Sequence, residues 1–456
     1  MKPCPLGALQ LVDLLIKNGL VVTMDESRRV IARGSIAIED GRILEVARSI
    51  KIREKPEEVI DARGKIVMPG LICSHTHLYG ILLRGAPLKV EPPTDFSQIL
   101  RRVWWPMDEA LTKEDAYASA LASCLEFIKT GTTCFADTFS GPNAISGVLD
   151  RIGEAVKQAG IRGILAFEAT ERRTRAEGAK GTRENERFIK KLKRKRSTKI
   201  RGMFSIHASF TVSDELLIHV RELAKRYGVP ITIHTSEGLE DVYHNYERYG
   251  KRTVERLYET GLLAGNVVLA HCVHVNEEEL KLIKRSGAKV AHNPMSNMLN
   301  AVGVAPVARM LLMGIPVGLG NDGYVFDGFE NIRAAFLVHK VALQDPRVIS
   351  FAEVLEMATI KGAELYGLRK ELGSLEPGKF ADLIIVNPST PTPLRPETVF
   401  GHLIHAVSGR DVETVIVGGN VVMREQKVLT LDEQEVMKIS RKAAEKLWER
   451  MEGVRR

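Results

Sequence analysis

The feature that most constrains the fold is a repeated alternation of short apolar segments and longer helical patterns through the middle of the chain. Most of the apolar segments follow a helical pattern that ends in Gly or Asn, a common signal of a helix C-terminus. The candidate strands span residues 66–75, 132–138, 162–170, 202–208, 230–237, 266–272, 288–294 and 316–323. Strands that alternate with helices in this way predict an α/β protein whose parallel sheet closes into a (β/α)₈ TIM barrel.

A doubly wound open sheet is the alternative architecture for this pattern. A dinucleotide-binding sheet of that kind carries a G-x-G-x-x-G segment after its first strand. Here the first candidate strand leads into His75, Thr76 and His77, without that segment. We therefore favour the barrel.

Both ends of the chain have a β-like pattern. Residues 13–67 are β-like, with alternating strands and Asp40-Gly41 as a turn between them, and residues 375–423 contain short β-branched runs broken by Pro, Gly and Asn. We expect the two ends to combine into one small composite β-sandwich, followed by a helix. The predicted division is 1–67 for the first part of the sandwich, 68–370 for the barrel, 371–430 for the second part and 431–456 for the C-terminal helix.

The positive charge of the chain does not indicate nucleic-acid binding. The net charge is +8, and the excess is concentrated in residues 190–201, KKLKRKRSTKIR, where no aromatic residue interleaves with the bases. A solvated helix face explains this segment better, and abundant Lys, Arg and Glu are also typical of a thermophile. We expect a small-molecule substrate and no nucleic-acid partner.

Cysteine usage and hydropathy indicate a cytoplasmic location. The cysteines are five in number, and none forms a C-x-x-C pair: Cys4, Cys73, Cys124, Cys134 and Cys272. This pattern favours reduced thiols over a disulfide framework. Asp13 and Lys17 interrupt the apolar run near the N-terminus, so no signal peptide is expected, and no apolar stretch approaches the length of a membrane span.

Every candidate strand ends on, or just before, a polar residue that can do chemistry. In chain order these residues are His75 and His77, Asp137, Glu168, His207, His234, His271, His292 and Asp322. One such residue alone is more often structural. Since active sites of barrels lie at the carboxyl ends of their strands, the whole series predicts an active site there.

The types of residue in this series indicate a metal. Three imidazoles and one carboxylate with room for a water suit Zn²⁺, with Fe²⁺ as the second choice. His75, His77, His234 and Asp322 would form such a set, for one ion per subunit. Binuclear barrels of this kind use a carbamylated lysine at the end of the fourth strand. That strand has no lysine here, so we expect a mononuclear site.

Glu237 is the candidate proton shuttle. It follows His234 by three residues, close enough to reach the same cavity without binding the metal. A carboxyl group beside a metal-activated water is the group expected to carry a proton to the substrate. The other interpretation is structural: Glu237 would lie at a helix N-terminus, where an acidic residue is favoured in any case. We favour the catalytic one because the neighbouring histidine is independently implicated.

Six segments taken together resemble one known superfamily. In chain order, PGLICSHTH, SIHASF, HTSE, LAH, HNPMSNM and GLGNDG resemble the motifs of the amidohydrolase superfamily. The likeness runs from residue 15 to residue 423 and is greatest to its mononuclear aminohydrolase and chlorohydrolase branch, which includes S-adenosylhomocysteine and guanine deaminases. Finer details, such as SHTHLYGILLRG and VWWPMDEAL, resemble a subgroup of aminohydrolases associated with selenium metabolism.

The resemblance implies roles for individual residues. It implies the same four metal ligands, Glu237 as general acid and base, and His271 as the residue that orients the attacking water, with Asp322 assisting. The substrate-binding candidates are His207, Arg84, Glu168 and Asn297, with Trp104, Trp105 and Arg172 as further wall residues and residues 84–105 as a lid-like loop. The usual His-Ala-Pro-Tyr element is His207-Ala208-Ser209-Phe210 here, and the usual Thr before Asp322 is Asn321, so the pocket differs from the family pattern.

The implied activity is hydrolytic deamination of a nitrogen heterocycle of the purine, pterin or adenosyl type, with release of ammonia. A chlorohydrolase or cyclic-amide hydrolase with the same site is the alternative. Because every expected ligand position is filled, a non-catalytic relative is disfavoured. The resemblance also implies a homo-oligomer, either a dimer or a tetramer.

Overall fold

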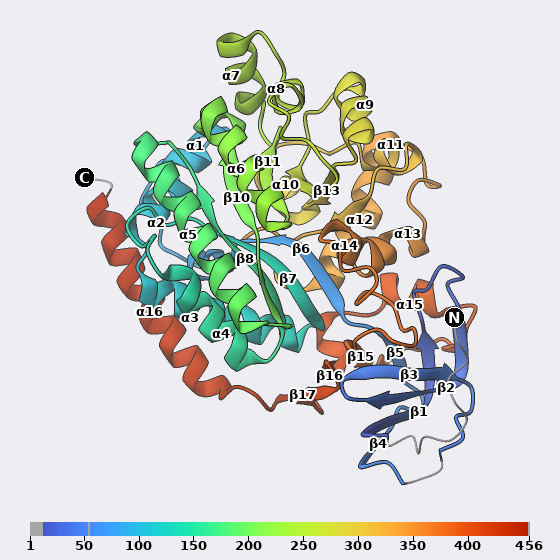
Figure 1. Cartoon of the computed structure of the whole chain (residues 1–456). Coiled ribbons are helices and arrows are strands. Elements are labelled where there is room, and N and C mark those ends of the chain that lie inside the picture. The colour runs from blue at the N-terminus through green and yellow to red at the C-terminus, as the bar shows by residue number, and fades with distance from the viewer. Residues whose placement is uncertain (1–11, 53–54, 455–456) are drawn as a thin grey trace.

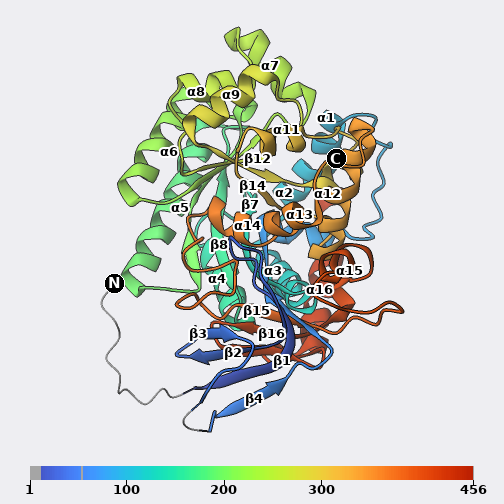
Figure 2. The same cartoon turned by 90° about the vertical axis from the view of Figure 1, so that its right-hand side faces the viewer.

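A computed structural model describes residues 12–52 and 55–454 of the chain. A parallel barrel surrounded by helices forms the larger part, and a smaller sheet lies beside its lower end (Figures 1 and 2). The predicted fold class, a barrel flanked by a β-structure from both chain ends, is confirmed. Cys4 lies outside the described residues, and the other cysteines are free and buried.

The barrel consists of parallel strands that follow one another in chain order. Along the sheet they are β6 (Leu71–Thr76), β7 (Thr132–Phe139), β8 (Arg162–Ala169), β10 (Phe204–Ala208), β11 (Ile231–Thr235), β12 (Val267–His271), β13 (Lys289–His292) and β14 (Val317–Leu319), with the short β9 (Ile200–Gly202) pairing with β8. Each of the predicted strands corresponds to one of them, except that the first half of the predicted strand 66–75 is β5 (Ile66–Pro69) of the smaller sheet, since the chain passes from one sheet to the other at Gly70. The barrel closes at the carboxyl ends, where Thr76 bridges to Asp322 and the N–H of Asn321 donates to the carbonyl of His75 over 3.0 Å.

Helices cover the outside of the barrel (Figure 1). They are α3 (Lys113–Lys129), α4 (Val148–Ala159), α5 (Arg175–Lys195), α6 (Asp214–Tyr227), α7 (Leu239–Tyr249), α8 (Thr253–Glu259), α9 (Glu277–Ser286), α11 (Val307–Leu312), α12 (Gly328–Leu343), α13 (Phe351–Met357) and α14 (Ile360–Leu365). Helix α3 begins with a capping box between Thr112 and Asp115. The basic stretch predicted as a helix face forms the largely exposed end of α5 and the residues just after it.

The segment between β6 and α3 differs from the predicted lid-like loop. It contains η1 (Leu78–Leu83), α1 (Phe96–Ile99), a π-helical turn η2 (Leu100–Trp104) and α2 (Trp105–Ala110), so its second half is helical. The helix begins because the side chain of Asp95 accepts from the N–H of Gln98 over 2.8 Å, which caps its first turn.

The smaller sheet contains strands from both ends of the chain. They are β1 (Leu14–Val22), β2 (Val30–Glu39), β3 (Arg42–Ala47), β4 (Glu58–Asp61), β5 (Ile66–Pro69), β15 (Leu383–Val386), β16 (Val412–Val417), β17 (Asn420–Arg424) and β18 (Lys427–Val428). The order is β18-β17-β16-β15-β5-β1-β2-β3, with β4 on β1, and the two ends meet where β15 pairs antiparallel with β5. Asp40 and Gly41, with φ of 47° and 71°, form the predicted turn between β2 and β3.

Strand β15 ties the sheet to the barrel because it is buried on both faces. Leu383 and Ile385 belong to a separate apolar cluster inside the sheet, while Ile384 and Val386 belong to the main core shared with the barrel helices. Alternate residues of a strand point to opposite faces. The sheet therefore has its own core and still packs on the barrel.

Gly70 is the junction between β5 of the sheet and β6 of the barrel. A Cβ at this position would lie 2.2 Å from Oγ1 of Thr133, so no larger residue fits without rearrangement. The N–H of Gly70 donates to the carbonyl of Asp382 over 3.1 Å, which fixes the chain as it leaves the sheet. This explains why Pro and Gly directly precede the histidine motif.

The C-terminal helix α16 (Glu433–Val454) confirms the helical pattern at the end of the chain. It packs along α3, where Ser440 donates to the carbonyl of Ala118. Nε1 of Trp448 donates to the carbonyl of Leu82 over 2.8 Å, so the helix also supports η1, directly after the histidine motif. The C-terminal helix is thus held by both α3 and η1.

The remaining helices are α10 (Pro294–Leu299), α15 (Val399–His405) and the short η3 (Ser209–Thr211) and η4 (Gly409–Asp411). None of the helices in the described ranges is long and apolar enough to cross a membrane.

A buried ion pair joins the barrel to the sheet. Arg162 at the start of β8 makes two bonds to Asp382, Nε to Oδ2 over 2.7 Å and Nη2 to Oδ1 over 3.0 Å, and both side chains are buried. Replacing Arg162 with Ala leaves a buried carboxylate without its cation. We expect the free energy of unfolding to fall by about 3–5 kcal/mol, measured by chemical denaturation.

The exposed pair between Arg151 and Glu154 on α4 is the matched control. Arg151→Ala should change the free energy of unfolding by less than about 1 kcal/mol. Equal effects of the two substitutions would show that the buried pair has no special role in stability.

Candidate metal centre

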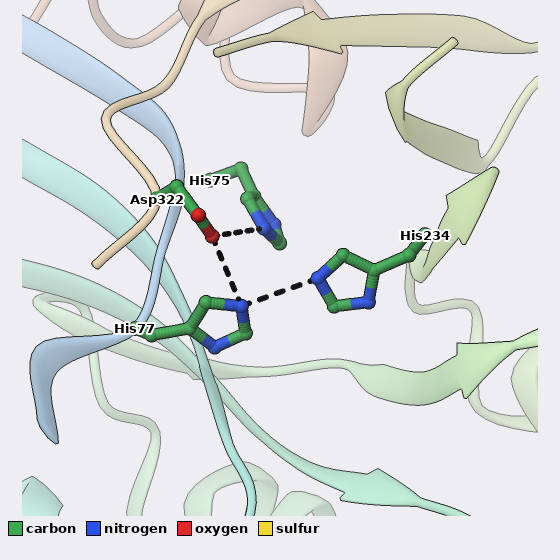
Figure 3. A group of neighbouring side chains, drawn as sticks. All are labelled: His75, His77, His234 and Asp322. Atoms are coloured by element: carbon green, nitrogen blue, oxygen red, sulfur yellow. Dashed lines mark hydrogen bonds and ion pairs between the residues drawn. The ribbon is translucent and has the colours of Figure 1, made fainter. Parts of the chain in front are cut away.

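Four of the predicted side chains meet at the carboxyl end of the barrel. His75 lies in β6, His77 directly after it, His234 in β11 and Asp322 shortly after β14 (Figure 3). Oδ1 of Asp322 is 3.2 Å from Nε2 of His77 and 3.5 Å from Nε2 of His75, and the Nε2 atoms of His77 and His234 are 3.2 Å apart. All four residues are buried, and one ligand atom from each lies within 4.8 Å of the others.

The proton positions on these rings fit a bound cation. Nδ1 of His77 donates to the carbonyl of Thr138 over 2.8 Å, and Nδ1 of His234 donates to the carbonyl of His207 over 2.7 Å. A carbonyl can only accept, so each ring carries a proton on Nδ1, and the Nε2 atoms that face each other are free to hold a second proton or a metal ion. Two lone pairs at 3.2 Å repel each other unless a proton or a metal ion lies between them.

The electrostatics of the group favour positive charge. Burial lowers the pKa of His77, but its hydrogen bond to Asp322 and the charge of that carboxylate outweigh burial and raise the pKa to about 10. Burial lowers the pKa of His75 to about 4. Burial also opposes ionisation of Asp322, yet the bonds from His75 and His77 hold its pKa well below the usual range. Three imidazoles and one carboxylate are a donor set that fits Zn²⁺ or a similar divalent ion.

A second group shares Asp322 with the first. Glu237, His271 and Asp322 offer ligand atoms that also lie within 4.8 Å of one another, and Oε2 of Glu237 is 3.5 Å from Nε2 of His271. Burial, with the nearby charge of Asp322, raises the pKa of Glu237 to about 8. Burial lowers the pKa of His271 to about 3.

His271 is oriented as a proton acceptor. Its Nδ1 lies 2.8 Å from Oδ1 of Asn297, an acceptor, so the ring proton lies on Nδ1. Its buried Nε2 has no hydrogen-bond partner among the described residues. A neutral ring with a bare Nε2 beside Glu237 and Asp322 can take a proton from a group placed between them.

The backbone at these strand ends is strained. His271, Asp322 and Ser236 have φ of 72°, 59° and 48°, in the left-handed region that non-glycine residues rarely adopt. Strain of this kind persists where the surroundings hold it and is frequent at functional sites. Ser296, which sequence reasoning did not single out, helps to hold Asp322, since its hydroxyl donates to Oδ2 over 2.5 Å.

A cavity opens directly onto the metal group. It is lined by His77, Tyr79, Phe96, Leu100, Trp104, Trp105, Asp108, Glu168, His207, Ala208, Phe210, His234, Glu237, Gly238, Glu240, Asp241, Asn300 and Asp322. The structure thus brings the predicted His207, Glu168, Trp104 and Trp105 to the cavity. Residues of α1 and α2 cover it, which places the helical part of the lid over the site.

His207 presents an acceptor to this cavity. The hydroxyl of Thr211 donates to the carbonyl of Ala208 over 3.0 Å and therefore accepts from Nδ1 of His207 over 2.9 Å. Burial lowers the pKa of His207 to about 3, so the ring is neutral and its Nε2 is bare. A hydroxyl or N–H of a bound molecule could donate to it.

Two of the predicted substrate residues lie elsewhere. Arg84 is not among the residues that line the cavity; its side chain pairs with Glu126 over 3.2 Å and donates to the carbonyl of Tyr324 over 3.0 Å. Asn297 also lies outside the cavity lining and contacts His271 instead. Position in a motif does not say toward which neighbour a side chain turns, and a substrate contact of Arg84 or Asn297 stays a prediction.

Asp108 and Phe96 are cavity residues that sequence reasoning missed. Asp108 is buried and forms an ion pair with Arg172 over 3.1 Å, and the guanidinium of Arg172 stacks over the ring of Trp105 at 4.8 Å. Burial raises the pKa of Asp108 to about 6. The sequence offered one signal for this residue: Asp108 directly follows the apolar segment VWWPM, where an acidic side chain is unexpected. His292, at the end of β13, pairs with His339 over 3.1 Å and takes no part in the metal group.

Comparison with known proteins agrees with this arrangement. The model of the amidohydrolase family matches residues 66–422. The chain belongs to the amidohydrolase family. It is therefore a hydrolase, and the expected family resemblance is confirmed.

This amidohydrolase is similar over nearly its whole length to named deaminases. It is 37% identical over 441 residues to a 5′-deoxyadenosine deaminase of Methanosarcina mazei, which covers 96% of this chain and 99% of that protein. It is 36% identical over 430 residues to a 5-methylthioadenosine/S-adenosylhomocysteine deaminase of Carboxydothermus hydrogenoformans, covering 93% and 96%. The likeness to the selenium-associated subgroup stays a prediction.

A solved structure shares the fold. An adenosine deaminase of Xanthomonas campestris with bound zinc superposes with a TM-score of 0.88 at 25% identity, covering 96% of this chain and 99% of that one. The zinc is a property of that protein. It agrees with the donor set of His75, His77, His234 and Asp322 described above.

Proposed function

We propose that this amidohydrolase is a metal-dependent deaminase of adenine nucleosides of the 5′-deoxyadenosine and 5′-methylthioadenosine type. Water replaces the amino group of the ring, and ammonia leaves. The names of relatives at 37% and 36% identity support the substrate class. The observation that carries the proposal is the shared position of Asp322, which belongs both to the four-residue metal group and to the group with Glu237 and His271. Asp322 and Glu237 also line the cavity.

The metal group would be His75, His77, His234 and Asp322, holding one Zn²⁺ per chain, with Fe²⁺ as the alternative. When bound, such an ion lowers the pKa of a water molecule that it holds from 15.7 to about 7. His271 and Asp322 lie where they can accept the proton of that water, because the bare Nε2 of His271 and a carboxylate oxygen of Asp322 are parts of the same group.

Glu237 would move protons to the substrate. Its carboxyl group lies in the cavity, 3.5 Å from Nε2 of His271. From there it donates a proton to the ring nitrogen next to the amine-bearing carbon. It then regains a proton from His271, which has taken it from the attacking water, and passes it to the departing amino group. The second proton of the water restores the carboxyl group of Glu237 when the ring carbonyl forms. His207 would accept a hydrogen bond from the substrate, and the aromatic rings of Trp104 and Phe96 would cover the bound molecule and exclude water.

The location and assembly of the enzyme are further parts of the proposal. Free, buried cysteines support a cytoplasmic location. Exposed apolar residues on one side of α12, Leu337 and Val341, support a homo-oligomer, a dimer or a tetramer, in which this side is covered. Light scattering on the purified chain measures the oligomer directly.

The activity can be tested with a panel of compounds and an assay for ammonia. The zinc-loaded enzyme should release ammonia from 5′-deoxyadenosine and 5′-methylthioadenosine, with S-adenosylhomocysteine, adenosine, guanine and a pterin as comparison substrates. A chelator should stop the reaction, and added zinc should restore it. The panel also contains a chlorotriazine and a cyclic amide; turnover of either one, without ammonia from any nucleoside, would replace the proposed activity with the chlorohydrolase or cyclic-amide alternative.

A further inference from the structure

Glu168 lies beside the metal group in a position that the proposed reaction does not use. It lies near the end of β8, and only β10 separates this strand in the sheet from β11, which carries His234. Glu168 is only 2% exposed. Its Oε1 is 3.2 Å from Nδ1 of His234, and no well-directed hydrogen bond to this oxygen is present within residues 12–52 and 55–454. A buried carboxylate without directed donors is costly unless a charge nearby compensates it.

The geometry at His234 indicates that the compensating charge is a cation bound on the opposite side of this ring. The N–H at Nδ1 points at the carbonyl of His207, 2.7 Å away, and the carboxylate of Glu168 lies beside this bond. The opposite ring nitrogen, Nε2, faces the other members of the metal group. When Nε2 binds a cation, the ring becomes electron-poor, and a carboxylate at Nδ1 stabilises it and makes it a stronger ligand.

His234 differs in this respect from the other two imidazoles. Nδ1 of His77 contacts the uncharged carbonyl of Thr138, and Nδ1 of His75 has no hydrogen-bond partner among the described residues. Asp322 approaches both of those rings on the Nε2 side, where the metal would bind. Of these three rings, His234 is the one with a carboxylate on the side away from the metal group.

The charges also balance with Glu168 included. Three neutral imidazoles and the carboxylate of Asp322 leave a divalent ion with one uncompensated positive charge. A second carboxylate, one ring away, brings the buried group to neutrality. A buried group without net charge is more stable in a medium of low dielectric than one with net charge.

We propose that Glu168 is a positioning residue that strengthens metal binding through His234, and not a substrate contact. The proposal rests on the metal site of the proposed function but not on the identity of the substrate. Zinc affinity measured without substrate therefore tests it separately from the deaminase activity.

The test is a competition titration of zinc against a chelator, with the full chain and with Glu168→Gln. The substitution keeps the size of the side chain and removes its charge. We expect the dissociation constant for zinc to rise about 10–100-fold, the usual cost of losing an outer partner of a metal ligand. Glu168→Asp keeps the charge on a shorter side chain and should lose less affinity than Glu168→Gln.

Asp108→Asn is the matched control. Asp108 is a buried carboxyl group on the wall of the same cavity, but it pairs with Arg172 and not with a histidine. Its replacement should leave zinc affinity unchanged. At saturating zinc, Glu168→Gln should also keep the KM of the wild-type enzyme, because the proposal gives Glu168 no contact with substrate.

The results separate the two proposals. Unchanged zinc affinity in Glu168→Gln, or a raised KM at saturating zinc, would overturn the role of Glu168. If Glu168→Gln does not fold, Glu168→Ala takes its place, and unchanged zinc affinity in that variant would overturn the role equally. Weaker zinc binding in a protein that deaminates no nucleoside would leave this inference standing and reject only the proposed substrate. A wild-type chain that binds neither Zn²⁺ nor Fe²⁺ would reject both.

Discussion

Glu237→Gln should abolish deamination while the metal stays in place. Gln has nearly the same shape as Glu but can neither release nor accept a proton at neutral pH. The proposed reaction needs two proton transfers through this carboxyl group, one to the ring nitrogen and one to the leaving amino group. We expect kcat/KM to fall by about 10²–10⁴-fold, the usual contribution of a general acid and base.

The measurement is steady-state ammonia release together with zinc content. Glu237 is not a member of the four-residue metal group, so zinc should remain at one ion per chain. Glu247→Gln, at an exposed position of helix α7, which begins two residues after Glu237, is the control and should retain activity within about twofold. A fully active Glu237→Gln enzyme would show that another group carries the protons.

His77→Ala should remove the metal itself. His77 touches both Asp322 and His234, each over 3.2 Å, and is therefore central to the group. Its loss removes one of four ligands and, of the two imidazoles paired with Asp322, leaves only His75. We expect zinc affinity to fall by more than the ~10–100-fold that is typical of losing an outer partner, and activity to fall with it.

Two readouts make this prediction specific. Zinc content after dialysis should drop to the background level, and the rise in melting temperature that zinc gives the wild-type protein should disappear, because an ion stabilises only a protein that binds it. His219→Ala changes an exposed histidine on α6 and should keep both properties. Stoichiometric zinc in His77→Ala would contradict the proposed ligand set.

Much of the fold was predictable because strand ends and helix ends carry local signals. The predicted strand with Glu168 near its end matches β8, and the one with His234 matches β11. The likeness of the two chain ends also predicted that they would share a sheet, as β5 and β15 do. These features depend on short-range periodicity, which a sequence displays directly.

The direction of individual side chains was not predictable. Arg84 follows the histidine motif closely but pairs with Glu126, and Asn297 turns to His271. Asp108, just beyond residues 84–105 that were expected to be a loop, reaches the cavity because α2 carries it there. Each of these outcomes depends on a neighbour far away in the chain.

The sequence by itself determined which residue types stand at the strand ends, and with them the family and a candidate donor set of three histidines and one aspartate. It could do so because alternation along strands and turn residues after helices are local properties. Only the tertiary structure decided which of these residues meet. His75 and Asp322 belong to opposite ends of the barrel sequence. They come within 3.5 Å because the first and last strands meet, where Thr76 bridges to Asp322 and closes the barrel. Glu168 approaches His234 for the same reason, since curvature of the closed sheet turns the ends of separate strands toward one axis.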